Sequence, residues 1–329
     1  MSKTLLEVKN MHVSIHTDSG VIQAVRGVSF DLKESETLAI VGESGSGKSI
    51  TNRAIMGLLP VGGRIDEGQV ILNGRDISRF TEKEMNAIRG VEVSMIFQDP
   101  LTSLNPTMTV GNQITEMLML HKPEMTKEQR RERALELLDM VGIPNPIERI
   151  DQYPHQFSGG MRQRVMISIA LACEPQILIA DEPTTALDVT IQAQILELMK
   201  KLQKKVNTSI IIITHNLGVV SSMADRVQVM YGGRFVESGV LDEVFYETKH
   251  PYTRGLMDSI PNMQLSNQKL YSIPGTPPDL ISPPRGCPFA ARCSRCMKVC
   301  EEFPPSEYIF SGTHRASCWL YDERAKGVF

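Results

Sequence analysis

A glycine-rich segment early in the chain has the composition of a phosphate-binding loop. Gly42-Glu43-Ser44-Gly45-Ser46-Gly47-Lys48-Ser49 follows the apolar stretch 38–41, which predicts a strand, and precedes a helical stretch from Ile50. Glycines allow successive backbone N–H groups to turn inward around phosphate oxygens. Lys48 can then reach the β- and γ-phosphates, and the Ser49 hydroxyl can ligate Mg²⁺. The segment predicts a site for ATP or GTP.

Two adjacent carboxylates stand at the end of a second apolar run. Residues 177–180 are followed by Asp181 and Glu182, and ligands of open α/β sheets bind at the carboxyl ends of strands. Asp181 is predicted to hold Mg²⁺ directly or through water, and Glu182 to orient and polarise the attacking water. Taken alone, the pair is also explained as an acidic helix cap. Together with the phosphate loop it favours nucleotide hydrolysis.

A third motif, Ser158-Gly159-Gly160, stands at a predicted helix start. A hydroxyl and two unhindered backbone N–H groups at a helix N-terminus make a second phosphate site. Gln98 and His215 each follow an apolar run. The amide could touch Mg²⁺ or the attacking water, and the imidazole could hydrogen-bond the γ-phosphate. By itself, each of these two residues is also explained as structural, Gln98 as a glutamine in a turn.

The elements that must position these residues are those of an α/β fold. Four compact apolar runs lack polar alternation, as central parallel strands covered on both faces do. They are 37–41, 93–97, 177–180 and 210–213. Residues 5–30 alternate around turns such as 18–20, which predicts an antiparallel, half-exposed sheet. Residues 110–141 predict helix, so the expected fold is an α/β nucleotide core with a helical insertion.

The bulk properties limit the classes of function. A formal net charge of −3 gives no reason to expect nucleic-acid binding by bulk electrostatics. The N-terminus lacks the basic-then-apolar pattern of a secretion signal, and the longest apolar runs are far below the ~18 residues that span a bilayer. We therefore expect a cytosolic chain, which can still dock on a membrane protein.

The character of the chain changes after about residue 239. Closely spaced prolines between 251 and 288 interrupt regular structure and predict a small, loop-rich extension from about residue 256. Five cysteines crowd this end of the chain: Cys287, Cys293, Cys296, Cys300 and Cys318. In a reducing cytosol such a group indicates a metal or cluster site rather than disulfides. Cys173 stands apart in an apolar stretch and is predicted to be a core residue.

In this order, the motifs resemble those of the nucleotide-binding subunits of ATP-binding cassette transporters, over roughly residues 1–250. The matches are residues 42–49 to the Walker A loop, Gln98 to the Q-loop, 158–160 to the signature, 177–181 to Walker B, Glu182 to the catalytic glutamate, 186–188 to the D-loop and His215 to the switch histidine. Phe157 and Met161 depart from the usual Leu-Ser-Gly-Gly-Gln signature. The aromatic residue that stacks on adenine is also missing from its slot, which holds Ile15 next to His16.

The resemblance implies a P-loop NTPase fold with a RecA-like core, an antiparallel β subdomain and a helical subdomain at about 106–165. This nucleotide-binding domain would occupy 1–255, and the extension 256–329. Two subunits are implied to pack head to tail, with each ATP between the phosphate loop of one and the signature of the other. The implied nucleotide contacts are Gly42, Ser44, Gly45, Ser46, Gly47, Lys48, Ser49, Ile50, Gln98, Asp181, Ser158, Gly159, Gly160, Asp188 and His16. The implied Mg²⁺ ligands are Ser49, Gln98 and Asp181, and the implied catalytic residues are Glu182, His215 and Gln98.

The end of the chain resembles the C-terminal extension of dipeptide and oligopeptide importer ATPases. Residues 250–256, 274–280 and 286–293 carry this similarity, and 98–106 and 153–157 add to it within the core. The resemblance implies a peripheral ATPase on the cytoplasmic face of the cell membrane, energising peptide uptake. The implied partners are a sister ATPase subunit, two transmembrane permease subunits and an extracellular or periplasmic peptide-binding protein. Nickel or another small solute is the alternative cargo.

In some members of that group, four cysteines of the extension bind a four-iron four-sulfur cluster. The matching positions are Cys287, Cys293, Cys300 and Cys318, and Cys296 is extra. Thiolates suit iron–sulfur clusters and zinc alike. A zinc site and free thiols therefore stay open as alternatives.

Two rival functions come from other branches of cassette ATPases. Those that handle nucleic acid carry long coiled-coil arms, tandem cassettes or inserted zinc modules, whereas this chain has one cassette, no long heptad array and no dominant basic block. Exporter ATPases are commonly fused to membrane segments. We therefore expect an importer subunit with no nucleic-acid partner.

Overall fold

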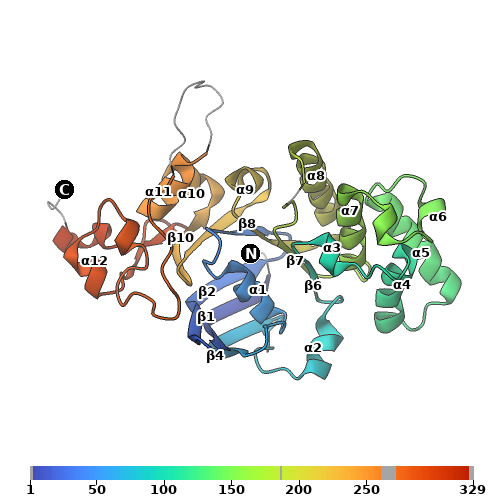
Figure 1. Cartoon of the computed structure of the whole chain (residues 1–329), viewed down its shortest axis with the longest axis horizontal. Helices are drawn as coiled ribbons and strands as arrows, with labels where there is room; N and C mark the ends of the chain where they lie inside the picture. Colours follow the sequence, from blue (N-terminus) through green and yellow to red (C-terminus); the bar gives the residue numbers. More distant parts are fainter. Residues whose placement is uncertain (1–2, 186, 261–271, 326–329) are drawn as a thin grey trace. The chain divides into compact units, whose positions relative to one another are not determined.

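The computed structural model describes residues 3–185, 187–260 and 272–325. The chain folds into two units, each assembled from segments that are far apart in the sequence (Figure 1). The first unit comprises Met1–Leu5, Leu32–Thr37 and Arg79–Ile213, and the second Leu6–Asp31, Leu38–Ser78 and Thr214–Phe329.

The antiparallel sheet predicted near the N-terminus is present, with the strand order β2-β1-β4-β5. Its strands are β1 (Thr4–Thr17), β2 (Gly20–Lys33), β4 (Gly63–Leu72) and β5 (Arg75–Asp76). The β1–β4 register, with Leu6 opposite Leu72, shifts between Lys9 and His12. Asn10 lies in that irregularity with a φ of 44°, a left-handed conformation that asparagine tolerates better than most residues.

A second sheet of the second unit carries the strand that leads into the phosphate loop. Its strand order is β11-β12-β10-β9-β3. The strands are β3 (Thr37–Val41), β9 (Arg226–Tyr231), β10 (Arg234–Val240), β11 (Glu307–Ile309) and β12 (Arg315–Ser317). β3 is parallel to β9, and the β9–β10 hairpin turns through Gly232 and Gly233, both at positive φ, as a tight hairpin turn requires.

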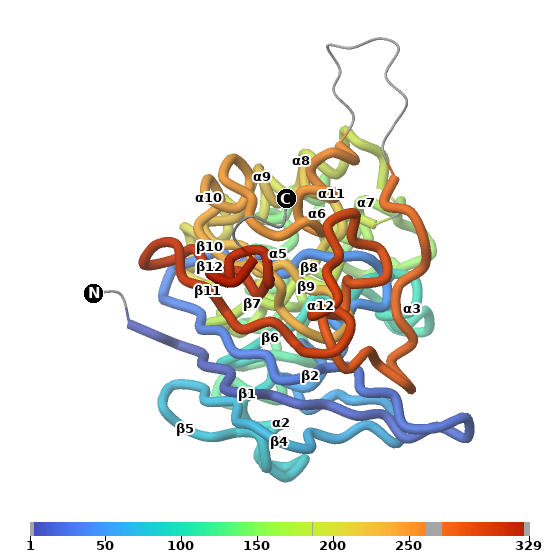
Figure 2. The backbone as a smooth tube through the Cα atoms, turned by 90° about the vertical axis from the view of Figure 1, so that its left-hand side faces the viewer, coloured from blue at the N-terminus to red at the C-terminus, as the bar shows by residue number. Residues whose placement is uncertain are grey.

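The C-terminal extension joins this sheet by backbone pairing. β12 pairs antiparallel with β10, and β11 with β12 (Figure 2). The helices of the unit are α1 (Lys48–Ile55), α9 (Leu217–Met223), α10 (Leu241–Tyr246), α11 (Pro251–Asp258) and α12 (Lys298–Glu302). Within residues 272–325 the unit also has 3₁₀ turns at Ala290–Arg292, between Cys287 and Cys293, and at Trp319–Tyr321 and Glu323–Ala325. Helix α11 runs across residue 255, where the sequence predicts the domain boundary.

The first unit contains a parallel sheet with the strand order β8-β7-β6. Strands β6 (Val93–Ile96), β7 (Ile177–Asp181) and β8 (Ser209–Thr214) are buried along their whole length. Val93 pairs with Ile177, and Ile177 with Ser209. These are the apolar runs in which the sequence predicts central strands. Their carboxyl ends lead to Gln98 and Glu182.

The first unit is otherwise rich in helices. They are α2 (Glu82–Ile88), α3 (Pro100–Ser103), α4 (Val110–His121), α5 (Lys127–Met140), α6 (Pro146–Arg149), the 3₁₀ turn Pro154–Gln156, α7 (Gly159–Ala170) and α8 (Val189–Val206). Helices α4, α5 and α7 pack on one another (Figure 1). The continuous helix expected over 110–141 is in fact two, because Pro123 interrupts it and Thr126 starts α5 with a capping box to Gln129. Among the described residues, no helix has both the length and the apolar character needed to span a bilayer.

Candidate functional site

The phosphate loop follows β3 and closes around Lys48. Gly45 and Gly47 have φ values of 77° and 108°, in the left-handed region that favours glycine. A Cβ at Gly47 would also collide with the carbonyl of Ala24. Lys48 Nζ, nearly fully buried, donates to the carbonyls of Gly42 at 2.7 Å and Glu43 at 2.8 Å. Since α1 begins at Lys48, backbone N–H groups and a cation converge as an anion site requires.

Other segments of the second unit hold the backbone of this loop in place. A Cβ at Gly42 would collide with the carbonyl of Met230, and Gly233 N donates to Ser46 O at 2.9 Å. Glu43 N donates to the Tyr252 hydroxyl at 2.8 Å. The β9–β10 hairpin and α11 therefore fix the loop backbone. The sequence does not reveal this support, because the supporting residues lie near the loop only in three dimensions.

The carboxylate pair ends β7. Asp181 is buried, and Glu182 has a φ of 48°, an unfavourable conformation for a non-glycine residue that costs about 1–3 kcal/mol. The Glu182 carboxylate accepts hydrogen bonds of 2.9 Å from Gln98 Nε2 and from Thr185 Oγ1. Its backbone N donates to Ile213 O. Gln98 and Glu182 are 84 residues apart and meet because β6 and β7 pair in parallel. Thr185 is a further partner of Glu182, and no motif in the sequence points to it.

The Ser-Gly-Gly motif begins α7, as the sequence predicts. Ser158 is the N-cap, and its hydroxyl accepts a hydrogen bond from Met161 N at 3.4 Å. Ser158 and Gly159 are exposed. A Cβ at Gly159 would only reach van der Waals contact with Leu187, at 4.0 Å, and Gly159 does not have positive φ. The described part of this chain therefore gives no reason for a glycine there.

The other predicted residues lie at element ends or on the surface. His215 follows β8 in the second unit and is exposed, as is His16 in β1. Asp188 is the N-cap of α8, where its side chain accepts from Ile191 N at 2.9 Å. Ser44 is exposed, while Ser49 and Ile50 are half-buried in α1. Ala186, part of the predicted D-loop, lies outside the described residues.

Comparisons with known proteins identify the family. The ABC transporter family model matches residues 25–185, and the model of the oligopeptide/dipeptide transporter C-terminal region matches residues 236–300. The dipeptide transport ATP-binding protein DppD of Bacillus subtilis is 57% identical over 98% of this chain and 96% of its own length. The chain belongs to the ABC transporter family.

Other relatives agree with this assignment. The oligopeptide transport ATP-binding protein OppD of Bacillus subtilis is 58% identical over 98% of this chain and 91% of its own length. Among solved structures, the dimeric post-hydrolysis state of the ATP-binding cassette MJ0796 bound to ADP and Pi is 30% identical, with a TM-score of 0.65 over 72% of this chain and 98% of that one. This ABC protein therefore has the cassette ATPase fold that the motifs predict.

The cysteines of the extension gather in one neighbourhood. Cys287, Cys300 and Cys318 are buried, and Cys287 N donates to Cys300 O at 2.7 Å. The thiols of Cys287, Cys293, Cys300 and Cys318 are near enough to one another to interact electrostatically, and Cys296 lies near Cys293 and Cys300. Burial, followed by neighbouring thiols, raises the pKa of Cys287 and of Cys318 to about 12. Within the described ranges, no three His, Cys, Asp or Glu side chains are close enough together to hold a single metal ion.

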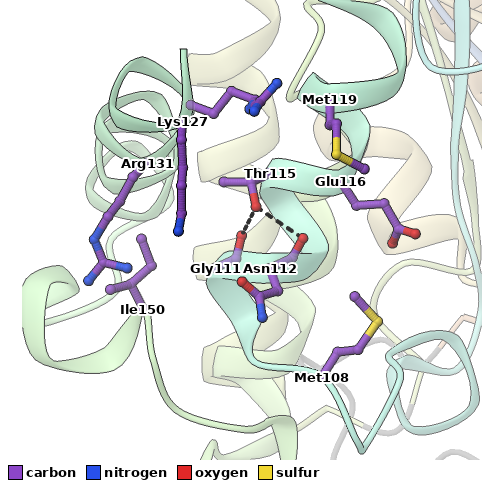
Figure 3. A pocket seen from close by; sticks show the side chains of 10 residues that line it. Met108, Gly111, Asn112, Thr115, Glu116, Met119, Lys127, Arg131 and Ile150 are labelled. Carbon is purple, nitrogen blue, oxygen red and sulfur yellow. Dashed lines mark hydrogen bonds between the residues drawn. The ribbon is translucent and has the colours of Figure 1, made fainter. Parts of the chain in front are cut away.

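A groove of about 390 Å³ lies on the helical part of the first unit (Figure 3). α4 supplies one wall, where Thr115 Oγ1 donates to the carbonyls of Gly111 and Asn112. α5 supplies basic side chains opposite. The lining residues are Met108, Gly111, Asn112, Thr115, Glu116, Met119, Lys127, Arg130, Arg131 and Ile150. Exposed methionine, here Met119, and arginine are enriched in surfaces that contact other proteins.

Proposed function

We propose that this chain is the ATP-hydrolysing subunit of a membrane importer of dipeptides or oligopeptides. The observation that carries the proposal is similarity along nearly the whole chain, extension included, to proteins named for dipeptide and oligopeptide transport. The extension matters because the cassette alone is shared by ABC proteins with many cargoes. Peptide is therefore the cargo class that the whole chain favours.

ATP binding is assigned to the loop from Gly42 to Ile50. The Lys48 ammonium and the backbone N–H groups of Gly45 and Gly47 would contact the phosphates, and His16 would lie near adenine. Mg²⁺ would be held by the Ser49 hydroxyl, the Gln98 amide oxygen and the Asp181 carboxylate. Hydroxyl, amide and carboxylate oxygens are the hard donors that Mg²⁺ prefers, so the residues fit this ion. When bound, it neutralises phosphate charge.

Hydrolysis is assigned to Glu182 as general base. Its carboxylate would accept a proton from the attacking water, while Gln98 Nε2 and Thr185 Oγ1, both 2.9 Å away, hold it in orientation. His215 would hydrogen-bond the γ-phosphate and respond to its loss. The strained φ of Glu182 supports this role, because such strain gathers at functional positions.

The second half-site is assigned to Ser158, Gly159, Gly160 and Asp188. These residues would contact ATP held by a sister ATPase subunit packed head to tail. Two observations support the proposal: Gly159 is exposed without a packing reason to be glycine, and the similar cassette MJ0796 is described as dimeric. ATP would then close the pair, and hydrolysis would open it.

The remaining partners follow from the importer role. Two permease subunits would hold the chain at the cytoplasmic face of the cell membrane, and a peptide-binding protein outside the membrane would deliver cargo. We assign the groove along α4 and α5 to a cytoplasmic segment of a permease subunit. The segment after Gln98 leads directly through α3 into α4, so the site and the groove are connected in sequence. The net charge of −3 supports the absence of a nucleic-acid partner.

Glu182→Gln tests the catalytic assignment. Glutamine keeps the size and an acceptor oxygen for Thr185, so we expect unchanged ATP affinity and a loss of about 10²- to 10⁴-fold in ATP turnover. Phosphate release by the assembled transporter and equilibrium ATP binding measure the two quantities. Glu174→Gln is the control, since Glu174 pairs with Arg133 on the surface. Near-normal turnover in the Glu182 variant would contradict the assignment.

Gly159→Ala tests the second half-site. The added methyl meets nothing closer than 4.0 Å within the chain, so the melting temperature should stay unchanged while turnover falls about tenfold or more, as for a lost phosphate contact. Gly312→Ala is the matched control, because Gly312 has no neighbour within 4 Å of the added carbon. Equal turnover in both variants would refute a phosphate contact at Gly159.

We also propose that Cys287, Cys293, Cys300 and Cys318 hold a four-iron four-sulfur cluster. The donor set fits, because four thiols share one neighbourhood although no three are close enough for a single ion, and a cluster spreads its ligands over four irons. The raised pKa values of Cys287 and Cys318 favour the protonated thiols, which would have to lose their protons to bind iron. The cluster would stabilise the fold of the extension, which is short and has little hydrophobic core of its own.

Metal analysis of anaerobic and aerobic preparations tests this. We expect about four iron and four acid-labile sulfide per chain, in the stoichiometry that defines the cluster. Cys287→Ser and Cys318→Ser should lose iron and its visible absorbance, whereas Cys296→Ser should keep both. Stoichiometric zinc without iron would overturn the proposal.

A further inference from the structure

We infer that Arg292, in the C-terminal extension, is a positioning residue for the phosphate loop and acts through Glu43. The inference rests on the proposed role of residues 42–49 in binding ATP. It adds a long-range support, 249 residues away in sequence, that no motif of the cassette contains.

The contact between the two side chains is a bidentate ion pair. Arg292 Nη1 lies 2.6 Å from Glu43 Oε2, and Arg292 Nη2 lies 3.2 Å from Glu43 Oε1. The Arg292 side chain is 5% exposed and that of Glu43 25% exposed. Paired N–H···O bonds between a guanidinium and a carboxylate fix direction as well as distance, and partial burial limits screening by solvent.

The extension holds the guanidinium in a single orientation. Nε donates to Pro274 O at 2.9 Å, Nη2 donates to Ile273 O at 3.0 Å, and Nη1 donates to the Tyr231 hydroxyl at 3.1 Å. With the two bonds to Glu43, all five N–H donors of the guanidinium are used. The charge also lies 5.7 Å from the centre of the Tyr231 ring. The guanidinium group of Arg292 is therefore held in one orientation before nucleotide binds.

Glu43 passes this constraint to Lys48. Its carbonyl accepts the Lys48 Nζ bond, and its backbone N donates to Tyr252. The Tyr252 ring packs on Tyr231 and on Phe289 of the extension, with centroids 4.5 and 5.3 Å apart. The side chain, N–H and carbonyl of Glu43 thus each have a bonding partner. The side chain bonds Arg292 of the extension directly, and the N–H bonds Tyr252, which packs on Phe289 of the extension.

The ion pair also removes a charge conflict. Without Arg292, the Glu43 carboxylate would stand as a partly buried anion in the loop that binds the phosphates of ATP. Like charges at short range in a low-dielectric site repel strongly. Arg292 therefore both orients the loop and neutralises the residue in it that opposes an anionic ligand.

Arg292→Gln and the double variant Arg292→Gln with Glu43→Gln test the inference. The single variant leaves Glu43 charged and unpaired by Arg292, so the Kd for ATP should rise about 10- to 100-fold, as loss of charged hydrogen bonds predicts. The double variant removes the unpaired charge and should regain most of the affinity. If Arg292 only stabilised the extension, a change at Glu43 would not restore the affinity for ATP.

ATP binding by the full chain and steady-state turnover of the assembled transporter give the readouts. We expect KM for ATP to rise in Arg292→Gln with kcat nearly unchanged, because Glu182 is untouched. Arg292→Lys keeps the charge but cannot make the bidentate contact, so its KM for ATP should lie between those of the wild type and Arg292→Gln. It replaces the glutamine variant if that variant does not fold. Arg315→Gln is the control, since its pair with Glu307 lies within the extension and is exposed.

The outcomes separate the two proposals. Wild-type Kd in Arg292→Gln, with ATP binding lost in Lys48→Ala, would overturn the inference and leave the phosphate loop intact. Weakened binding without recovery in the double variant would also overturn it. Unchanged binding in Lys48→Ala would instead overturn the proposed loop itself, and the inference with it.

Discussion

Replacement of Glu237 should reveal how the extension is joined to the cassette. The Glu237 carboxylate, on β10, is fully buried and accepts three hydrogen bonds: from Lys249 N at 2.7 Å, His250 N at 2.8 Å and His314 Nε2 at 2.9 Å. His314 is itself buried and directly precedes β12. One side chain therefore ties β10, the start of α11 and the extension together.

The size of the effect follows from these contacts. Glu237→Leu leaves two backbone N–H groups and one imidazole without an acceptor, and each buried unpaired donor costs about 1–3 kcal/mol. Measured losses when one member of a buried pair is removed are about 3–5 kcal/mol, so we expect about 4 kcal/mol. Glu237→Gln keeps one oxygen acceptor but presents an amide donor to the third partner, and should cost about half as much.

Thermal and urea unfolding of the full chain measure the loss, and amide hydrogen exchange locates it. The unfolding entropy of a chain of 329 residues is about 0.7 kcal/mol/K, so each kcal/mol shifts the melting temperature by about 1.5 °C and Glu237→Leu should lower it by roughly 6 °C. The amides of Lys249 and His250 should exchange much faster. Glu307→Gln is the control, because that carboxylate is exposed in its pair with Arg315. A Glu237→Leu loss no larger than that of the control would refute the reasoning.

Three further predictions concern single side chains. Burial lowers the pKa of His250 to about 3, below the ordinary 6.5; because the unfolded chain then binds a proton that the folded chain does not, stability should fall by up to about 1.4 kcal/mol per pH unit as pH drops below 6.5. His250→Asn, which keeps an acceptor for Tyr252 N, should remove that slope in urea titrations at pH 5–7, and an unchanged slope would contradict it. Burial raises the pKa of Cys173, so maleimide at neutral pH should label it only after unfolding, as mass spectrometry would show. Thr126→Ala breaks the capping box of α5 and should cost about 1 kcal/mol, with no change expected in ATP affinity.

Local chemistry explains why so much of the site could be predicted. The phosphate loop, the carboxylates after β7 and the cap at Ser158 each lie within a few consecutive residues, so composition and spacing suffice to define them. Unbroken apolar runs in the sequence indicate buried parallel strands. The division of residues 110–141 into α4 and α5 is different. Pro123 and the Thr126 capping box were visible in the sequence, but the apolar and charged pattern on both sides favoured one helix.

What only the tertiary structure decided are the contacts between distant segments. The sequence predicted a nucleotide-binding loop and a catalytic carboxylate, and it showed five cysteines near the end of the chain. It could not show that Arg292 reaches Glu43, that Glu237 meets His314, or that the extension thiols share one neighbourhood. An exposed and a buried glutamate look alike in a sequence, since pairing of a charged side chain depends on which strands and turns fold beside it. The extension's support of the phosphate loop is therefore a property of the fold, although every residue that makes it was present in the sequence.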